Sequence, residues 1–145
     1  MHAFVSTHMA EAEQLLETLS QIPSPSNKEE KRISFIASWF REKGGEVTVD
    51  EVGNVLCRLG HHDNGFVVFS AHIDIVDGSM EPLPLVKDGN IWRCPGIGDD
   101  TANVVNMMMA YLYAKEHEEE FSSDLLFVAD VGEEALGNLK GVRHL

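Results

Sequence analysis

The segment Phe66-Val-Val-Phe-Ser-Ala-His-Ile-Asp-Ile-Val76 contains the clearest strand pattern of this chain and the first of its chemically distinctive residues. Its opening residues, 66–71, form a nearly continuous apolar run, which is typical of a central strand covered on both faces. His72 and Asp74 follow directly, at the carboxyl end of that strand. In open α/β sheets, ligands bind beyond the carboxyl ends of the strands. The segment therefore predicts an α/β fold and the position of a functional site.

A second strand pattern ends in the same way. Asp124-Leu-Leu-Phe-Val-Ala129 reads as another buried strand, and Glu133 and Glu134 follow it within a few residues. Between the two strands, Asp99 lies in the turn Gly96-Ile-Gly-Asp-Asp-Thr101, which leads into a helix. Because strand ends of this kind meet at one edge of a sheet, we expect the three clusters to lie close together.

The remaining residues alternate between helix and strand periodicity without a linker or an internal repeat. Helices are expected over 7–21, from Ser26 or Asn27 to about residue 44, from about residue 99, and over 137–145; strands are expected over 46–50 and 54–59, with a short hairpin around 88–89. The prolines of Ile22-Pro-Ser-Pro-Ser26 separate the first two helices. The predicted class is α/β, with a largely parallel central sheet between helices.

Composition excludes several classes of protein. The 145 residues carry 11 basic and 24 acidic side chains, a formal charge of −13, which repels phosphate backbones and argues against nucleic-acid binding. No stretch approaches the roughly 20 apolar residues of a membrane span, and the N-terminus lacks the pattern of a signal peptide. Cys57 and Cys94 show no metal-type spacing and are expected to be free and reduced. We therefore expect a cytoplasmic protein without membrane partners.

The three clusters consist of residue types that bind metal ions. Each cluster taken singly has a more common explanation. A histidine at a strand end is more often a structural, hydrogen-bonded residue, and an Asp-Asp before a helix is more often an N-cap. A Glu-Glu pair is more often solvated surface. Their common placement at strand ends favours a shared site, in which a zinc pair would acidify a bound water and polarise a carbonyl. In this interpretation His72 binds one ion, Glu134 the other, and Asp99 bridges them. Asp74 would orient the imidazole of His72, and Glu133 would transfer protons.

Four motifs together, Ile22–Ser26, Ser70–Val76, Gly96–Asp100 and Val128–Ala135, resemble the dinuclear zinc exopeptidases and aminoacylases. That family includes carboxypeptidase G, peptidase T, succinyl-diaminopimelate desuccinylase and acetylornithine deacetylase. The resemblance implies a three-layer α/β/α domain and a cis peptide bond between the bridging aspartate and the next residue. It also implies the same roles for five residues: His72, Asp99 and Glu134 as metal ligands, Asp74 as the orienting carboxylate and Glu133 as the general acid and base.

The chain departs from that family in two respects. Thr101-Ala102-Asn103 stands where members often have a basic or small residue followed by glycine, and this could alter the local turn. The family also has a further Asp ligand, a late His ligand and a lid domain that often dimerises. His144 is a poor substitute for the late ligand, because it lies in a helix expected directly after the site. Residues 1–145 are therefore expected to be the N-terminal portion of a catalytic domain, C-terminally truncated and without its lid.

The predicted function is that of a zinc-dependent metallopeptidase, aminopeptidase-like or carboxypeptidase-like, acting on a small peptide or an N-acyl amino acid. The complete site would hold two Zn²⁺, or Co²⁺ or Mn²⁺, and the complete enzyme could be a homodimer. Val128–Glu134 favours the peptidase side of the family over an N-acyl amino acid deacylase. Two alternatives stay open: a metal-binding but non-catalytic fragment, and a metal-free structural domain. The chain by itself is expected to hydrolyse peptides very poorly.

Overall fold

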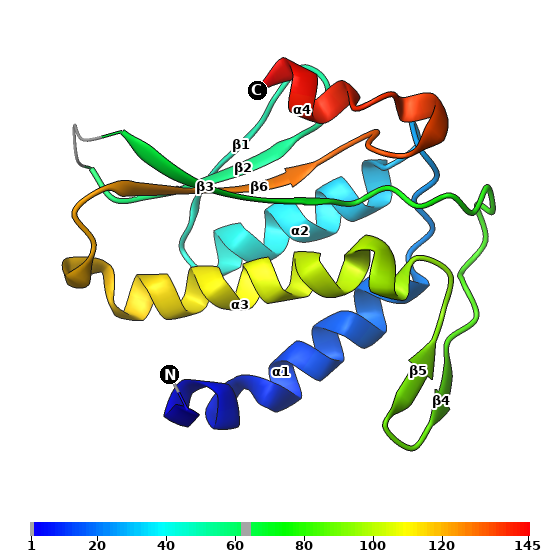
Figure 1. The fold of residues 1–145 in the computed structure, drawn as a ribbon, viewed down its shortest axis with the longest axis horizontal. Helices are drawn as coiled ribbons and strands as arrows, with labels where there is room; N and C mark the ends of the chain where they lie inside the picture. Colours follow the sequence, from blue (N-terminus) through cyan, green and yellow to red (C-terminus); the bar gives the residue numbers. More distant parts are fainter. Residues whose placement is uncertain (1, 62–64) are drawn as a thin grey trace.

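The computed structural model describes residues 2–61 and 65–145, which form a main sheet with helices on both of its faces and a separate hairpin (Figure 1). The helices are α1 (His2–Gln21), α2 (Glu30–Glu42), α3 (Ala102–Glu116) and α4 (Lys140–His144). A π-type turn over Ile97–Thr101, with non-helical backbone angles at Asp99 and Asp100, precedes α3. The strands are β1 (Glu46–Val49), β2 (Val55–Leu59), β3 (Phe66–His72), β4 (Val86–Asp88), β5 (Ile91–Arg93) and β6 (Asp124–Asp130). Helices α2 and α3 cover one face, α1 packs beneath α3, and the short α4 lies on the other face. The predicted α/β class is confirmed.

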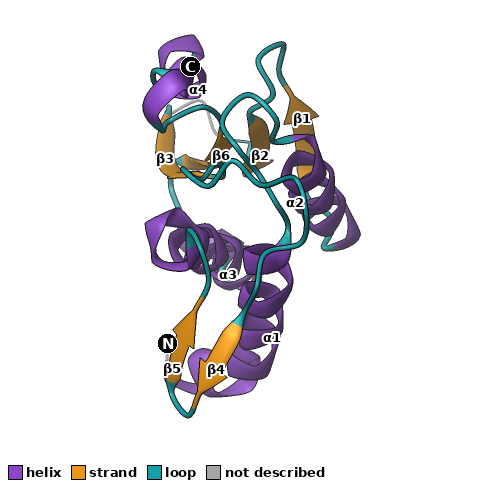
Figure 2. Cartoon of the chain, turned by 90° about the vertical axis from the view of Figure 1, so that its right-hand side faces the viewer, coloured by secondary structure: helices purple, strands orange, loops and turns teal. Residues whose placement is uncertain are grey.

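The main sheet is mixed, which corrects the expectation of a largely parallel one. Its strands lie in the order β1-β2-β6-β3, side by side in Figure 2, and β4 and β5 form a separate hairpin. Among the described strands of the main sheet, only β3 and β6 are parallel. β1 and β2 are joined by a tight turn in which the Asp50 carboxylate accepts the backbone N–H groups of residues 52–54. Such a turn reverses the chain, whereas the parallel pair is joined through the α3 crossover.

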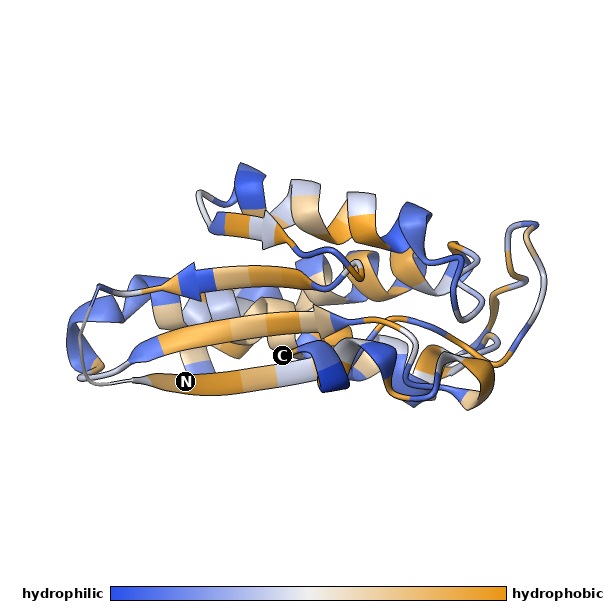
Figure 3. Ribbon diagram, turned by 90° about the horizontal axis from the view of Figure 1, so that it is seen from above, coloured by the Kyte–Doolittle hydropathy of each residue, from blue (hydrophilic) through white to orange (hydrophobic). Residues whose placement is uncertain are grey.

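The strand expected to be central, β3, lies instead at the end of the described sheet, with β6 as its one described neighbour. The side chains of Phe66, Val67, Val68 and Phe69 are 41–53% exposed. Figure 3 shows that the strands of the main sheet consist of hydrophobic residues along much of their length. The prediction of a strand buried on both faces was therefore wrong for the described residues. An apolar run indicates which surface suits burial, but it does not encode which elements cover it.

The core lies between the sheet and the layer of α2 and α3. The aromatic ring of Tyr111 on α3 meets those of Phe40 and Phe127 edge to face, at centroid distances of 5.1 and 5.5 Å. All three side chains are fully buried. Such contacts add about 0.5–1.5 kcal/mol each beyond area burial. They fix α3 against the sheet and so fix the position of the turn that precedes it.

Two predicted helix boundaries differ from the structure. α1 begins at His2 rather than at residue 7, and α2 begins at Glu30 rather than directly after Ser26 or Asn27. Asn27 adopts a left-handed conformation, with φ of 69°. No side chain of the segment between the helices caps the N-terminus of α2 through a hydrogen bond. The Ser26 hydroxyl instead bonds to Asp74. None of the helices within 2–61 and 65–145 has the length and apolar character that crossing a membrane requires.

A buried asparagine attaches α4 to the sheet. The Asn54 amide donates to the carbonyl of Gly141, at 3.0 Å, and its oxygen accepts the N–H of Val131, at 3.1 Å. The Gly141 N–H donates in turn to the carbonyl of Val131, at 2.8 Å. A Cβ on Gly141 would lie 2.3 Å from the Asn54 oxygen and 2.6 Å from the Val131 oxygen. Only glycine fits here without moving the backbone.

We expect Gly141→Ala to lower the free energy of unfolding by about 1–3 kcal/mol, because the added methyl group must separate α4 from the end of β6. Urea denaturation would measure the change. Gly78→Ala is the matched control, since an added Cβ there meets nothing within 4 Å. Equal effects of the two substitutions would contradict this attachment of α4.

Candidate metal centre

The structure brings the three predicted ligands together at one edge of the sheet. His72 ends β3, Asp99 lies in the turn before α3, and Glu134 follows β6. One ligand atom from each side chain can be chosen so that all three atoms lie within 4.8 Å of one another. The His72 Nε2 atom is 3.1 Å from the Asp99 Oδ1 atom. The parallel pairing of β3 with β6 causes this convergence, because it places His72 in register with Asp130.

The turn before α3 directs its two aspartates differently. The Asp99–Asp100 peptide bond is cis, as the sequence resemblance implies. The Asp99 side chain is 80% exposed and faces the imidazole of His72. The Asp100 carboxylate accepts the backbone N–H of His72, at 3.2 Å, and the side-chain amide of Asn103, at 2.5 Å. Asp100 therefore ties the turn to β3, and the unusual Asn103 supports that arrangement.

Asp74 is a fully buried carboxylate at the centre of the site. Its Oδ2 atom accepts the hydroxyl of Ser26, at 2.6 Å, and the N–H of Glu134, at 2.9 Å; its Oδ1 atom accepts the N–H of Glu133, at 2.9 Å. Burial by itself raises the pKa of Asp74, but these bonds and the neighbouring His72 outweigh it and hold the pKa well below its usual range. Asp74 is therefore ionised and binds the Glu133–Glu134 loop to the end of β3.

The imidazole of His72 is oriented by Asp74 through both main chain and side chain. Nδ1 donates to the backbone carbonyl of Asp74, at 3.1 Å, and lies 3.4 Å from the Asp74 carboxylate. Burial lowers the pKa of His72, but hydrogen bonds to Asp74 and Asp99 outweigh burial and raise it to about 9. Nε2 is thus directed at Asp99. A proton on Nε2 and a metal ion would compete for the same position.

The two glutamates complete a strongly acidic edge. The Glu133 carboxylate lies 3.9 Å from the His72 Nε2 atom and is 38% exposed. Burial and the neighbouring carboxylates of Asp99 and Glu133 raise the pKa of Glu134. One imidazole nitrogen with two converging carboxylates is a donor set that suits a divalent cation such as Zn²⁺. The donor chemistry and the mutual repulsion of the carboxylates both fit a bound metal ion.

Sequence reasoning missed Arg32, whose guanidinium is 1% exposed behind the site. Nε donates to the carbonyl of Ile22, and Nη1 donates to the carbonyl of Ile73 and the hydroxyl of Thr101, all at 3.0–3.1 Å. Burial lowers its pKa to about 10, although Cys94 and Asp74 counteract this. Arg32 thus joins the His72–Asp74 segment to the turn before α3. In the sequence it is one charged residue of an amphipathic helix, and no local pattern marks it as buried.

Asp130 is a further buried ionisable residue that the sequence pattern did not indicate. It ends β6 in register with His72, and its Oδ2 atom accepts the hydroxyl of Ser70 at 2.6 Å. Burial raises its pKa, with the Ser70 bond opposing this. The sequence predicts that Asp130 lies at the end of a strand. It does not predict that Asp130 is buried, because burial depends on segments that are distant in the sequence.

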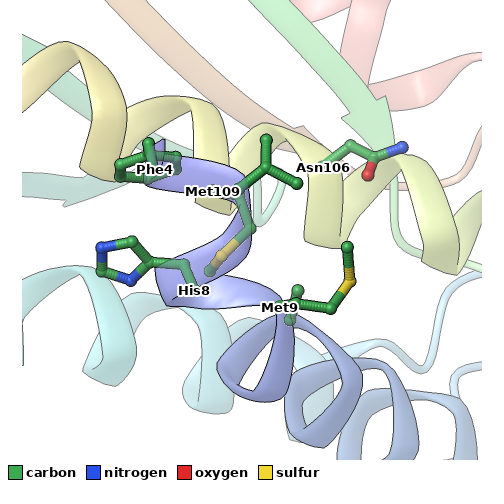
Figure 4. A pocket seen from close by; sticks show the side chains of 7 residues that line it. Phe4, His8, Met9, Asn106 and Met109 are labelled. Carbon is green, nitrogen blue, oxygen red and sulfur yellow. The ribbon is translucent and has the colours of Figure 1, made fainter. Parts of the chain in front are cut away.

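Other candidate groups lie apart from this edge. The imidazole of His144 bonds to the Glu51 carboxylate, at 2.7 Å, so the low expectation for His144 as a ligand agrees with its position. His61 is exposed, and the rest of the turn predicted over 60–65 lies partly outside the described residues. Cys57 and Cys94 are both free, as predicted. An apolar hollow between α1 and α3 is lined by Phe4, Val5, His8, Met9, Ala12, Asn106 and Met109 (Figure 4), and the three candidate ligands are not part of its lining.

Comparison with known proteins identifies the family. The model of peptidase family M28 matches residues 54–145, which include all five residues of the candidate site. This chain belongs to peptidase family M28. The match begins at β2 and runs through β3, the cis turn and the Glu133–Glu134 loop, so the family signature and the converging side chains occupy the same part of the fold. The resemblance to metal-dependent exopeptidases is confirmed.

The chain is also similar to individual relatives and to solved structures. The chain is 31% identical over 105 residues to the cytosol non-specific dipeptidase of Escherichia coli, covering 63% of this chain and 22% of that protein. It is 30% identical over 131 residues to a putative [LysW]-lysine/[LysW]-ornithine hydrolase of Pyrococcus abyssi, covering 90% and 35%. A dinuclear metal-binding peptidase of the M20 family from Bacillus subtilis shares the fold, with a TM-score of 0.64 at 17% identity over 95% of this chain and 40% of that one. The chain thus spans a fifth to about a third of these two curated relatives.

We expect metal binding to release about one proton near neutral pH, because the pKa of about 9 leaves His72 protonated there. Below that pKa a proton competes with the ion, so affinity should rise roughly tenfold per pH unit and level off above about pH 9. Titration calorimetry with Zn²⁺ in two buffers of different ionisation enthalpy would measure the release. His144→Ala is the control and should leave it unchanged. Binding without proton release would contradict His72 as a ligand.

Proposed function

We propose that this chain contributes the metal-binding edge of a zinc-dependent peptidase that hydrolyses a peptide or amide bond in a small substrate. The observation that carries the proposal is the convergence of His72, Asp99 and Glu134 within 4.8 Å, beside a buried carboxylate that fixes the imidazole. Membership of peptidase family M28 supports the class of reaction. Zinc is favoured over harder cations because an imidazole nitrogen is among the donors.

The proposed ligand roles follow from the geometry of the three side chains. The exposed Asp99 carboxylate lies closest to His72 and would bridge two ions; His72 would hold one of them and Glu134 the other. Two ions with three or more protein ligands each need more donors than these three side chains. The curated relatives are several times longer than the matched region, and we propose that the further Asp and His ligands expected of this family come from polypeptide outside residues 1–145.

A divalent cation held here would acidify a bound water and polarise the scissile carbonyl. The residues of this chain would do the rest. The Glu133 carboxylate, 3.9 Å from the His72 Nε2 atom and partly exposed, is placed to accept a proton from the attacking water and return it to the leaving amine. Its backbone N–H is held by Asp74, which keeps the side chain beside the ligands.

The substrate is proposed to be small. One relative is named a non-specific dipeptidase, which supports hydrolysis of a short peptide by a cytoplasmic enzyme. The Pyrococcus abyssi relative, which matches 90% of this chain, is named a [LysW]-lysine/[LysW]-ornithine hydrolase. That name supports the second candidate, hydrolysis of an amide bond to an amino acid, as in the deacylases. Both functions would use the same ligands and the same proton transfer.

In the full polypeptide we expect Glu133→Gln to lower kcat by about 10² to 10⁴, because the amide cannot accept the proton, while metal content stays unchanged. Glu134→Gln is the matched comparison at the adjacent position and should reduce the metal content itself. Dipeptide turnover and the metal-to-protein ratio would be measured on the same samples. Loss of metal from the Glu133 variant would make Glu133 a ligand, and undiminished turnover would exclude it from the chemistry.

A further inference from the structure

The segment Ile22–Ser26 has a role in the fold beyond ending α1. It continues as a short stretch beside the segment that follows His72: Pro25 forms a parallel bridge with Ile75, and the Ile75 N–H donates to the carbonyl of Ser24, at 2.9 Å. The Lys28 N–H donates to the Pro25 carbonyl, at 2.8 Å. Proline restricts φ to a narrow range, so the backbone before Ser26 has few alternatives.

This backbone places the Ser26 hydroxyl directly against the metal centre. The hydroxyl donates to the Oδ2 atom of Asp74, at 2.6 Å, and lies 3.2 Å from the carbonyl oxygen of Glu134. The same Oδ2 atom accepts the Glu134 N–H. Ser26 therefore contacts both the carboxylate that orients His72 and the main chain that carries Glu134. These contacts span 48 and 108 residues of sequence.

We propose that Ser26 is a positioning residue of the metal centre, which acts on His72 and Glu134 through Asp74. The inference rests on the proposed function and adds a residue to its machinery. Asp74 is fully buried, and its two oxygens accept hydrogen bonds from Ser26, Glu133 and Glu134, because a buried carboxylate needs donors. Without the hydroxyl, Oδ2 keeps only the Glu134 N–H, and the carboxylate can rotate. Rotation of the Asp74 carboxylate would change both its contact with the His72 imidazole and its hydrogen bonds to the Glu133–Glu134 loop.

The neighbouring Ser24 provides a matched control in the same segment. Ser24 is fully buried, whereas Ser26 is partly exposed, and the Ser24 hydroxyl has no hydrogen-bond partner among the described residues. Ser24→Ala therefore removes a hydroxyl of equal size with no contact to the metal centre. Ser26→Thr keeps a hydroxyl at the critical position and serves as the rescue variant.

The test uses the full polypeptide and measures its Co²⁺ and Zn²⁺ affinity by competition with a chromophoric chelator. The visible spectrum of bound Co²⁺ and the melting temperature in EDTA are recorded on the same variants. We expect Ser26→Ala to weaken binding of the metal about 10- to 100-fold and to change the Co²⁺ bands, as loss of a ligand-orienting partner does elsewhere. Ser24→Ala should keep wild-type affinity within about threefold, and Ser26→Thr should recover most of the loss.

The possible results separate this inference from the proposed function. Equal metal affinity in Ser26→Ala and wild type, whatever the melting temperatures, would overturn the positioning role and leave the proposed function standing. A full polypeptide of wild-type sequence that binds neither metal would overturn both. If Ser26→Ala does not fold in EDTA, Ser26→Val, which has the shape of the threonine variant but no hydroxyl, is compared with Ser26→Thr: weaker metal binding by the valine variant supports the role, and equal affinity overturns it.

Discussion

The site depends on one buried negative charge, the carboxylate of Asp74. Placing a carboxylate in the protein interior costs several kcal/mol unless hydrogen bonds and neighbouring charges compensate for it. Here the compensation comes from Ser26, from the backbone N–H groups of Glu133 and Glu134, and from the imidazole of His72. These groups lie in three separate segments of the chain. Satisfying the charge of Asp74 therefore assembles the segments that carry the candidate ligands.

The electrostatics of the edge favour a cation at the position that the ligands surround. Several carboxylates face the single imidazole of His72, and they raise its pKa to about 9 while the pKa of Glu134 also rises. The positive charge of Arg32 lies behind this edge, bonded to main-chain carbonyls and to the Thr101 hydroxyl rather than to the ligands. Arg32 thus stabilises the loops, while the negative charge at the ligands stays available for a metal ion.

Much of the site could be predicted because it depends on local patterns. Apolar runs followed by His72 and by Glu133–Glu134 identify strand ends, and strand ends of an α/β sheet converge. The direction of the strands and the exposed position of β3 could not be predicted, because an apolar run does not encode its neighbours. Arg32 and Ser26 were missed as parts of the site for a related reason. Their partners are 10 to 108 residues away in the sequence, and only the folded arrangement brings them together.

Anomalous diffraction from crystals of the chain grown with Zn²⁺ tests the central claim most directly. A zinc peak is expected about 2.0–2.2 Å from the His72 Nε2 atom and from carboxylate oxygens of Asp99 or Glu134, with the Asp74 carboxylate still bonded to Ser26. A zinc peak at another histidine, such as His8 beside Glu116 or His144 beside Glu51, with none at His72, would contradict the assignment of this edge as the metal centre.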